Sequence, residues 1–117
     1  MILDKFYPIF DTSEWLKRLL PIGIKFVQLR IKDKSKKEIQ SEIKKAKLLC
    51  YDFNAQLVIN DYWEMAVDEK CNFVHIGQED LVNCDIKKLK SNNVKIGIST
   101  HDQKELNTAL LHEPDYI

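Results

Sequence analysis

The 117-residue sequence has few of the residues that stabilise small disulfide-rich or zinc-bound domains. Its three cysteines, Cys50, Cys71 and Cys84, are odd in number, far apart in sequence and without a CxxC pair. This spacing argues against a disulfide framework and against a zinc site. Free thiols of this kind are typical of a reducing compartment, so we expect a cytoplasmic protein.

Long hydrophobic runs and an excess of one charge are also lacking. No apolar run approaches the roughly 18 residues of a membrane span, and Asp4 and Lys5 stand where a signal peptide would be apolar. Eighteen basic residues balance eighteen acidic ones, so no net field attracts nucleic acid or a membrane surface. We therefore expect neither kind of partner.

Glycine is scarce, with three residues in the chain, and the glycine-rich turn of a dinucleotide-binding fold is missing after the first expected strand. The remaining pattern alternates strand and helix, which is typical of a parallel sheet covered by helices. Expected strands are 6–10, 26–32, 56–60, 72–76 and 94–99, and Tyr116 and Ile117 begin a sixth. Expected helices begin at Thr12 or Ser13 and at the capping box Ser35–Glu38, and cover 62–69, 85–90 and 102–110.

The second expected strand carries an unusual polar row. Gln28, Arg30 and Lys32 alternate with an apolar face of Val27, Leu29 and Ile31, which is suited to packing under a helix. If helices cover the apolar face, the polar row turns toward the interior. Burying two cations without a partner is costly. An anionic ligand is therefore expected beside this strand.

Other polar residues follow the ends of the later expected strands. Asn60 and Asp61 end the third strand, Asp80 follows the fourth, and Ser99 ends the fifth. In α/β barrels the site lies at these carboxyl ends, and two carboxylates together with substrate phosphates are a typical Mg²⁺ environment. The residues alone leave two interpretations open: a site for Mg²⁺ and a diphosphate, or an internal network of ion pairs.

Several of these segments, in this order and spacing, resemble the thiamine phosphate synthase family over nearly the entire chain. They are Tyr7-Pro8-Ile9, Gln28-Leu29-Arg30-Ile31-Lys32-Asp33, Ile59-Asn60-Asp61-Tyr62-Trp63, His75-Ile76-Gly77-Gln78-Glu79-Asp80-Leu81 and Gly97-Ile98-Ser99-Thr100-His101. The resemblance implies a TIM (β/α)₈ barrel and a transferase of thiamine biosynthesis that condenses a pyrimidine diphosphate with a thiazole phosphate, releasing diphosphate and forming thiamine phosphate.

The resemblance also implies residue roles. The pyrimidine diphosphate would be bound by Gln28, Arg30, Lys32, Asn60 and Ser99. Mg²⁺, the implied cofactor, would be held by Asp61 and Asp80. No side chain is assigned as a catalytic nucleophile or base, because the family's reaction depends on stabilising the leaving group and orienting the substrates. His75 and His101 are expected to pack or to form hydrogen bonds.

The chain departs from the family in its length. A closed eight-stranded barrel needs at least about 200 residues, whereas this sequence has about five βα units and the start of a sixth strand. We therefore expect residues 1–117 to form a single domain, an incomplete barrel that is the N-terminal portion of a TIM-barrel synthase. The family's thiazole-phosphate segment is absent from this sequence.

This shortfall leaves an alternative function: a truncated, non-catalytic remnant that at most binds the pyrimidine diphosphate. The related thiazole tautomerase-like branch is disfavoured by the paired Asp61 and Asp80. Association into a homo-oligomer is left open by the sequence.

Overall fold

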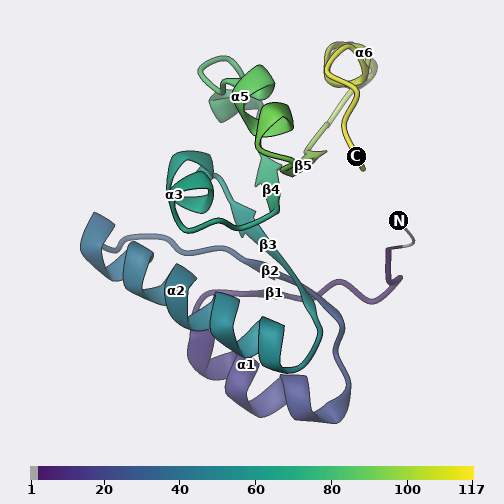
Figure 1. The fold of residues 1–117 in the computed structure, drawn as a ribbon. Coiled ribbons are helices and arrows are strands. Elements are labelled where there is room, and N and C mark those ends of the chain that lie inside the picture. Colours follow the sequence, from purple (N-terminus) through teal and green to yellow (C-terminus); the bar gives the residue numbers. More distant parts are fainter. Residues whose placement is uncertain (1–2) are drawn as a thin grey trace. The chain divides into compact units, whose positions relative to one another are not determined.

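The computed structural model describes residues 3–117, which have an α/β architecture with five parallel strands (Figure 1). The chain divides into two compact units. The first unit ends at Asn60 and the second is Asp61–Ile117. Each unit alternates strands and helices, as the sequence predicts.

The first unit contains three parallel strands in the order β1-β2-β3, and its helices α1 and α2 lie together on one side of them (Figure 1). Gln28 of β2 is level with Ile9 of β1 and with Val58 of β3. The elements are β1 (Ile9–Phe10), α1 (Ser13–Leu19), the 3₁₀-helix η1 (Leu20–Ile22), β2 (Phe26–Leu29), α2 (Lys36–Asp52) and β3 (Gln56–Asn60).

Two different contacts satisfy the starts of the first unit's helices. The Ser35 hydroxyl accepts a hydrogen bond from the Glu38 amide at 3.2 Å, which confirms the capping box at the start of α2. Thr12, which precedes α1, makes no side-chain cap. Instead the Ser13 amide donates to the Glu42 carboxylate at 3.0 Å, so α2 supplies the acceptor for α1.

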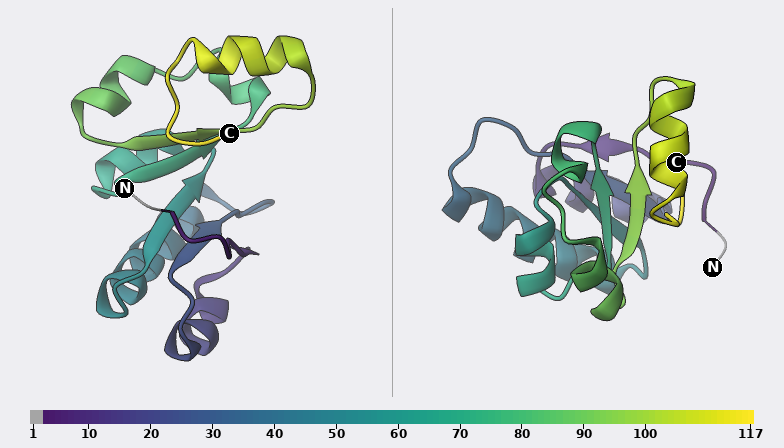
Figure 2. Two further views of the ribbon diagram at one scale, coloured as in Figure 1. Left: turned by 90° about the vertical axis from the view of Figure 1, so that its right-hand side faces the viewer. Right: turned by 90° about the horizontal axis from the view of Figure 1, so that it is seen from above.

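The second unit contains two parallel strands and four short helices, with α6 beside β5 (Figure 2). A parallel bridge joins Tyr116 to Gly97, and this bridge confirms the predicted start of a sixth strand. The elements are α3 (Trp63–Asp68), β4 (Phe73–Ile76), α4 (Gln78–Leu81), α5 (Ile86–Ser91), β5 (Lys95–Ile98) and α6 (Gln103–Leu110).

The structure differs from the sequence-based expectation at several elements. The first strand, expected over 6–10, is only Ile9–Phe10. The strand expected over 26–32 ends at Leu29, because its paired register with both β1 and β3 ends there. The Arg30 amide still donates to the Phe10 carbonyl at 2.8 Å. The one-turn helix α4 was not among the expected helices. The parallel α/β fold is confirmed, but the strands are not seen to close into a barrel.

Within residues 3–117, no helix has both the length and the apolar character needed to cross a bilayer.

Candidate functional site

In the first unit, Gln28 lies inside the fold as the alternation of β2 predicts. Its side chain is 3% exposed, and its amide nitrogen donates to the Tyr7 hydroxyl at 2.9 Å. The Tyr7 ring in turn stacks on Phe26, with ring centroids 4.1 Å apart. A buried amide with a fixed orientation can read the donors and acceptors of a small ligand.

The two cations that follow Gln28 are exposed and not buried. Arg30 and Lys32 lie beyond the end of β2, whereas Leu29 and Ile31 between them are buried as predicted. The expectation that the whole polar row turns toward the interior is therefore wrong for the two charges. Exposure removes most of the desolvation cost of these two charges.

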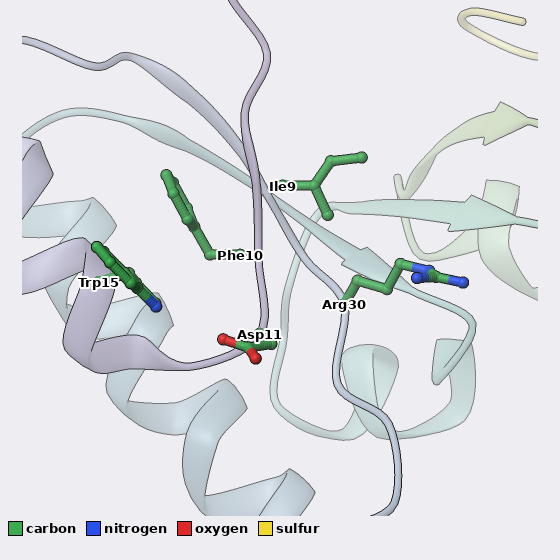
Figure 3. Close-up of a pocket in the computed structure, with 5 residues that line it drawn as sticks. All are labelled: Ile9, Phe10, Asp11, Trp15 and Arg30. Atoms are coloured by element: carbon green, nitrogen blue, oxygen red, sulfur yellow. The ribbon is translucent and has the colours of Figure 1, made fainter.

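Arg30 lines a cavity of about 430 Å³ at the end of β1 (Figure 3). Ile9 and Arg30 extend to one side of β1, and Phe10 and Trp15 extend to the other, with Asp11 at the end of the strand (Figure 3). The Phe10 and Trp15 rings are nearly parallel, with centroids 6.3 Å apart. The cavity thus combines an aromatic wall with one group of each charge.

Asn60, the last residue of β3, is 5% exposed, and its amide nitrogen has no hydrogen-bond partner among residues 3–117. Buried donors are nearly always satisfied in folded proteins, so an orphaned one needs an explanation. An acceptor atom on a bound ligand would satisfy it. This observation supports the predicted contact between Asn60 and a substrate.

The two predicted Mg²⁺ ligands, Asp61 and Asp80, both belong to the second unit. Asp61 is half-buried and has the left-handed φ of 66°, and its amide donates to the His75 carbonyl at 2.9 Å. Asp80 is exposed in the first turn of α4, directly after β4. Within residues 3–117, no three His, Cys, Asp or Glu side chains are grouped as metal ligands.

The predicted substrate contact Ser99 belongs to a hydrogen-bonded cluster. Its hydroxyl lies 2.5 Å from Nε2 of His75, whose Nδ1 lies 2.6 Å from the Tyr116 hydroxyl. Gln78 donates to the Ser99 carbonyl at 2.7 Å. Burial lowers the pKa of His75, partly opposed by the charge of Asp61. The expectation that His75 forms hydrogen bonds is confirmed.

Tyr116 and Gln78 belong to this cluster but were not among the predicted site residues. Tyr116 lies over Gly97, where a Cβ atom would overlap its ring. A glycine inside a strand indicates that another group approaches the backbone closely. Gly97 could therefore have predicted a close contact, but not that Tyr116 makes it.

His101 and the cysteines lie outside this cluster. The exposed His101 contacts the Glu105 carboxylate at 3.1 Å. The three cysteines are free thiols, as predicted. Burial raises the pKa of Cys84 to about 11, and the nearby Asp85 and Asp80 add to the shift. Cys84 is thus a protonated, weakly nucleophilic thiol at neutral pH.

Comparisons with known proteins agree with the resemblance. The family described as thiamine monophosphate synthase matches residues 4–117. A thiamine-phosphate synthase from Rhizobium etli is 50% identical over 117 residues, all of this chain and 57% of that protein. One from Salmonella typhimurium is 43% identical over 95% of this chain and 53% of that protein.

A solved structure, thiamine phosphate pyrophosphorylase from Pyrococcus furiosus, superposes with a TM-score of 0.80 at 26% identity, covering 94% of this chain and 56% of that one. The chain thus spans about half the length of the relatives it matches. The match along nearly all of the described residues confirms the predicted family: the chain belongs to the thiamine monophosphate synthase family.

Proposed function

We propose that the protein is a transferase that joins 4-amino-2-methyl-5-hydroxymethylpyrimidine diphosphate to a thiazole phosphate. The bond between the pyrimidine's methylene carbon and the diphosphate breaks, the thiazole nitrogen bonds to that carbon, and diphosphate leaves. The observation that carries this proposal is the 50% identity to a thiamine-phosphate synthase over the whole of this chain.

The first unit supplies the groups suited to the pyrimidine diphosphate. Gln28 and Asn60 are buried amides that can orient a polar ring, and the unpartnered nitrogen of Asn60 would donate to it. Arg30 and Lys32 are exposed cations just beyond the strand and would bind the diphosphate oxygens. Ser99 of the second unit is the fifth proposed substrate contact.

The second unit supplies the groups suited to Mg²⁺. The carboxylates of Asp61 and Asp80 would hold the ion, which usually keeps several waters and binds through one or two carboxylates and substrate phosphates. A donor set of two carboxylates fits this preference better than it fits zinc, which takes four protein ligands in structural sites. When bound, Mg²⁺ would neutralise negative charge on the diphosphate.

The proposed chemistry needs no nucleophile from the protein. The aminopyrimidine can delocalise positive charge, so the diphosphate can leave before the thiazole nitrogen attacks. Arg30 and Lys32 would stabilise the negative charge that develops on the leaving group, and Gln28 and Asn60 would hold the ring in line. We further propose that the whole protein is a cytoplasmic TIM barrel acting on small molecules.

Isothermal titration of the chain with the pyrimidine diphosphate and MgCl₂ tests the proposed site. We expect Arg30→Gln to weaken binding roughly tenfold or more, because a charge-assisted hydrogen bond contributes about 1.5–3 kcal/mol. Arg18→Gln on α1 is the matched control, since Arg18 lies over the Trp15 ring, 5.7 Å from its centre, and has no assigned role.

A turnover assay with both substrates separates the two functions considered for the chain. Formation of thiamine phosphate supports the transferase. Binding of the pyrimidine diphosphate by the whole protein without turnover supports the binding function alone. Equal binding by wild type and Arg30→Gln would contradict the assignment of Arg30.

A further inference from the structure

The second unit contains a continuous chain of hydrogen bonds that ends at Ser99. The Tyr116 hydroxyl lies 2.6 Å from Nδ1 of His75, and Nε2 of the same ring lies 2.5 Å from the Ser99 hydroxyl. The three side chains come from β4, the end of β5 and the sixth-strand segment. None of the site residues proposed above requires His75 or Tyr116.

We propose that Tyr116 and His75 are positioning residues that make the Ser99 hydroxyl a hydrogen-bond donor toward the substrate. In this arrangement Tyr116 donates to Nδ1, the proton on Nε2 of His75 is donated to the Ser99 oxygen, and the Ser99 proton is left to point outward. This inference rests on the proposed function, in which Ser99 contacts the pyrimidine diphosphate.

The chemistry of the two hydroxyl groups sets the direction of the chain. A neutral imidazole has one ring proton, so one nitrogen donates and the other accepts. A phenol is more acidic than an aliphatic alcohol, with a pKa near 10, and is the better donor of the two. The Tyr116 hydroxyl therefore donates to Nδ1, which places the ring proton on Nε2.

The surrounding residues hold this arrangement in place. The Tyr116 ring stacks on His75 with centroids 5.5 Å apart, and it lies over Gly97 where any side chain would collide with it. At the Ser99 end of the hydrogen-bond chain, the Gln78 side chain donates a hydrogen bond to the Ser99 carbonyl. Because both ends of the chain are held, the orientation of the Ser99 hydroxyl is preorganised.

An outward-pointing donor matches the proposed ligand. A diphosphate oxygen and a pyrimidine ring nitrogen are both acceptors, whereas an outward lone pair on Ser99 would repel them. With the opposite direction of the chain, His75 would accept from Ser99 and leave that hydroxyl without a proton to donate. The tautomer of His75 thus determines whether Ser99 can bind the ligand.

The first experiment measures the tautomer directly. Long-range ¹H–¹⁵N correlation spectra of the ¹⁵N-histidine-labelled chain at neutral pH distinguish the two ring nitrogens. We expect His75 to be protonated at Nε2 in the wild type and to shift toward Nδ1 in Tyr116→Phe. Tyr51→Phe, which removes an exposed hydroxyl from α2, is the matched control and should leave the His75 signals unchanged. A wild-type His75 protonated at Nδ1 would overturn the proposal.

The second experiment links the tautomer to binding. Tyr116→Phe should weaken binding of the pyrimidine diphosphate in MgCl₂ roughly five- to tenfold, as expected for one lost hydrogen bond, with little added effect in a Ser99→Ala background. Full-strength binding by Tyr116→Phe would overturn the proposal. If the wild type binds no pyrimidine diphosphate, the proposed function fails, while the tautomer measurement still decides the direction of the hydrogen-bond chain.

Discussion

The first unit, which ends at Asn60, and the second, Asp61–Ile117, differ in how their polar interior groups are hydrogen-bonded. In the first, the buried amide nitrogen of Asn60 has no partner among residues 3–117. In the second, both ring nitrogens of His75 are engaged by Tyr116 and Ser99. In the second unit the polar side chains of this cluster therefore satisfy one another. The first unit contains a buried donor that a ligand would satisfy.

The units also differ in their helices. α2 of the first unit has 17 residues and buries Ile39, Ile43, Ala46 and Cys50 along one stripe. α6, the longest helix of the second unit, has eight residues and buries only Ala109. The first unit thus depends on one long amphipathic helix, and the second on contacts around its strands.

Ile43→Ala should give the largest loss of stability. The Ile43 side chain is fully buried in the middle of α2, so truncating it removes apolar contacts and leaves a cavity, at a cost of about 2–5 kcal/mol. Chemical denaturation followed by circular dichroism measures this. Leu48→Ala on the same helix is the control, since Leu48 is 67% exposed. Equal losses in the two variants would show that α2 is not the main support of the first unit.

Gly97→Ala should have the next largest effect, on the second unit. The new methyl group would collide with the Tyr116 ring, which must move and lose its contact with His75. We expect a loss of about 1–3 kcal/mol, as is typical of overpacking, together with a changed His75 spectrum. Gly77→Ala is the matched control, because no atom lies within 4 Å of a Cβ at that position. Equal stabilities would contradict the role assigned to the Gly97–Tyr116 contact.

Much of the fold could be predicted from local chemistry. The Ser35 capping box predicted the start of α2, and the alternation of strand and helix predicted a parallel sheet covered by helices. The end of β2 could not be predicted, because it depends on the length of β1, a tertiary partner. The turn α4 was missed because four residues are too short for a helical period to appear.

The candidate site was predictable to the extent that residue type and family pattern determine it. The burial of Gln28 and Asn60 follows from their place in the strands. The exposure of Arg30 does not, since it depends on where β2 ends. The contact between His75 and Tyr116 joins two residues that are 41 positions apart in sequence. No local pattern specifies such a pair, which only the parallel pairing of the final segment brings together.

Of the proposed substitutions, Asn60→Leu should change the free energy of unfolding least. It therefore tests ligand binding with little change in folding. Leucine has nearly the shape of asparagine, and no partner among residues 3–117 loses a hydrogen bond with the amide nitrogen. The free energy of unfolding should therefore stay within about 1 kcal/mol of the wild type or rise. Binding of the pyrimidine diphosphate should nevertheless weaken.

Gln28→Met is the informative comparison, because Gln28 does have a partner in the first unit. It removes the bond to Tyr7 and should destabilise the chain by about 0.5–1.5 kcal/mol. Denaturation and titration of both variants measure the two quantities. A large loss of stability in Asn60→Leu would mean that its amide supports the fold. The contrast between the unpartnered Asn60 amide of the first unit and the engaged His75 ring of the second would then be wrong.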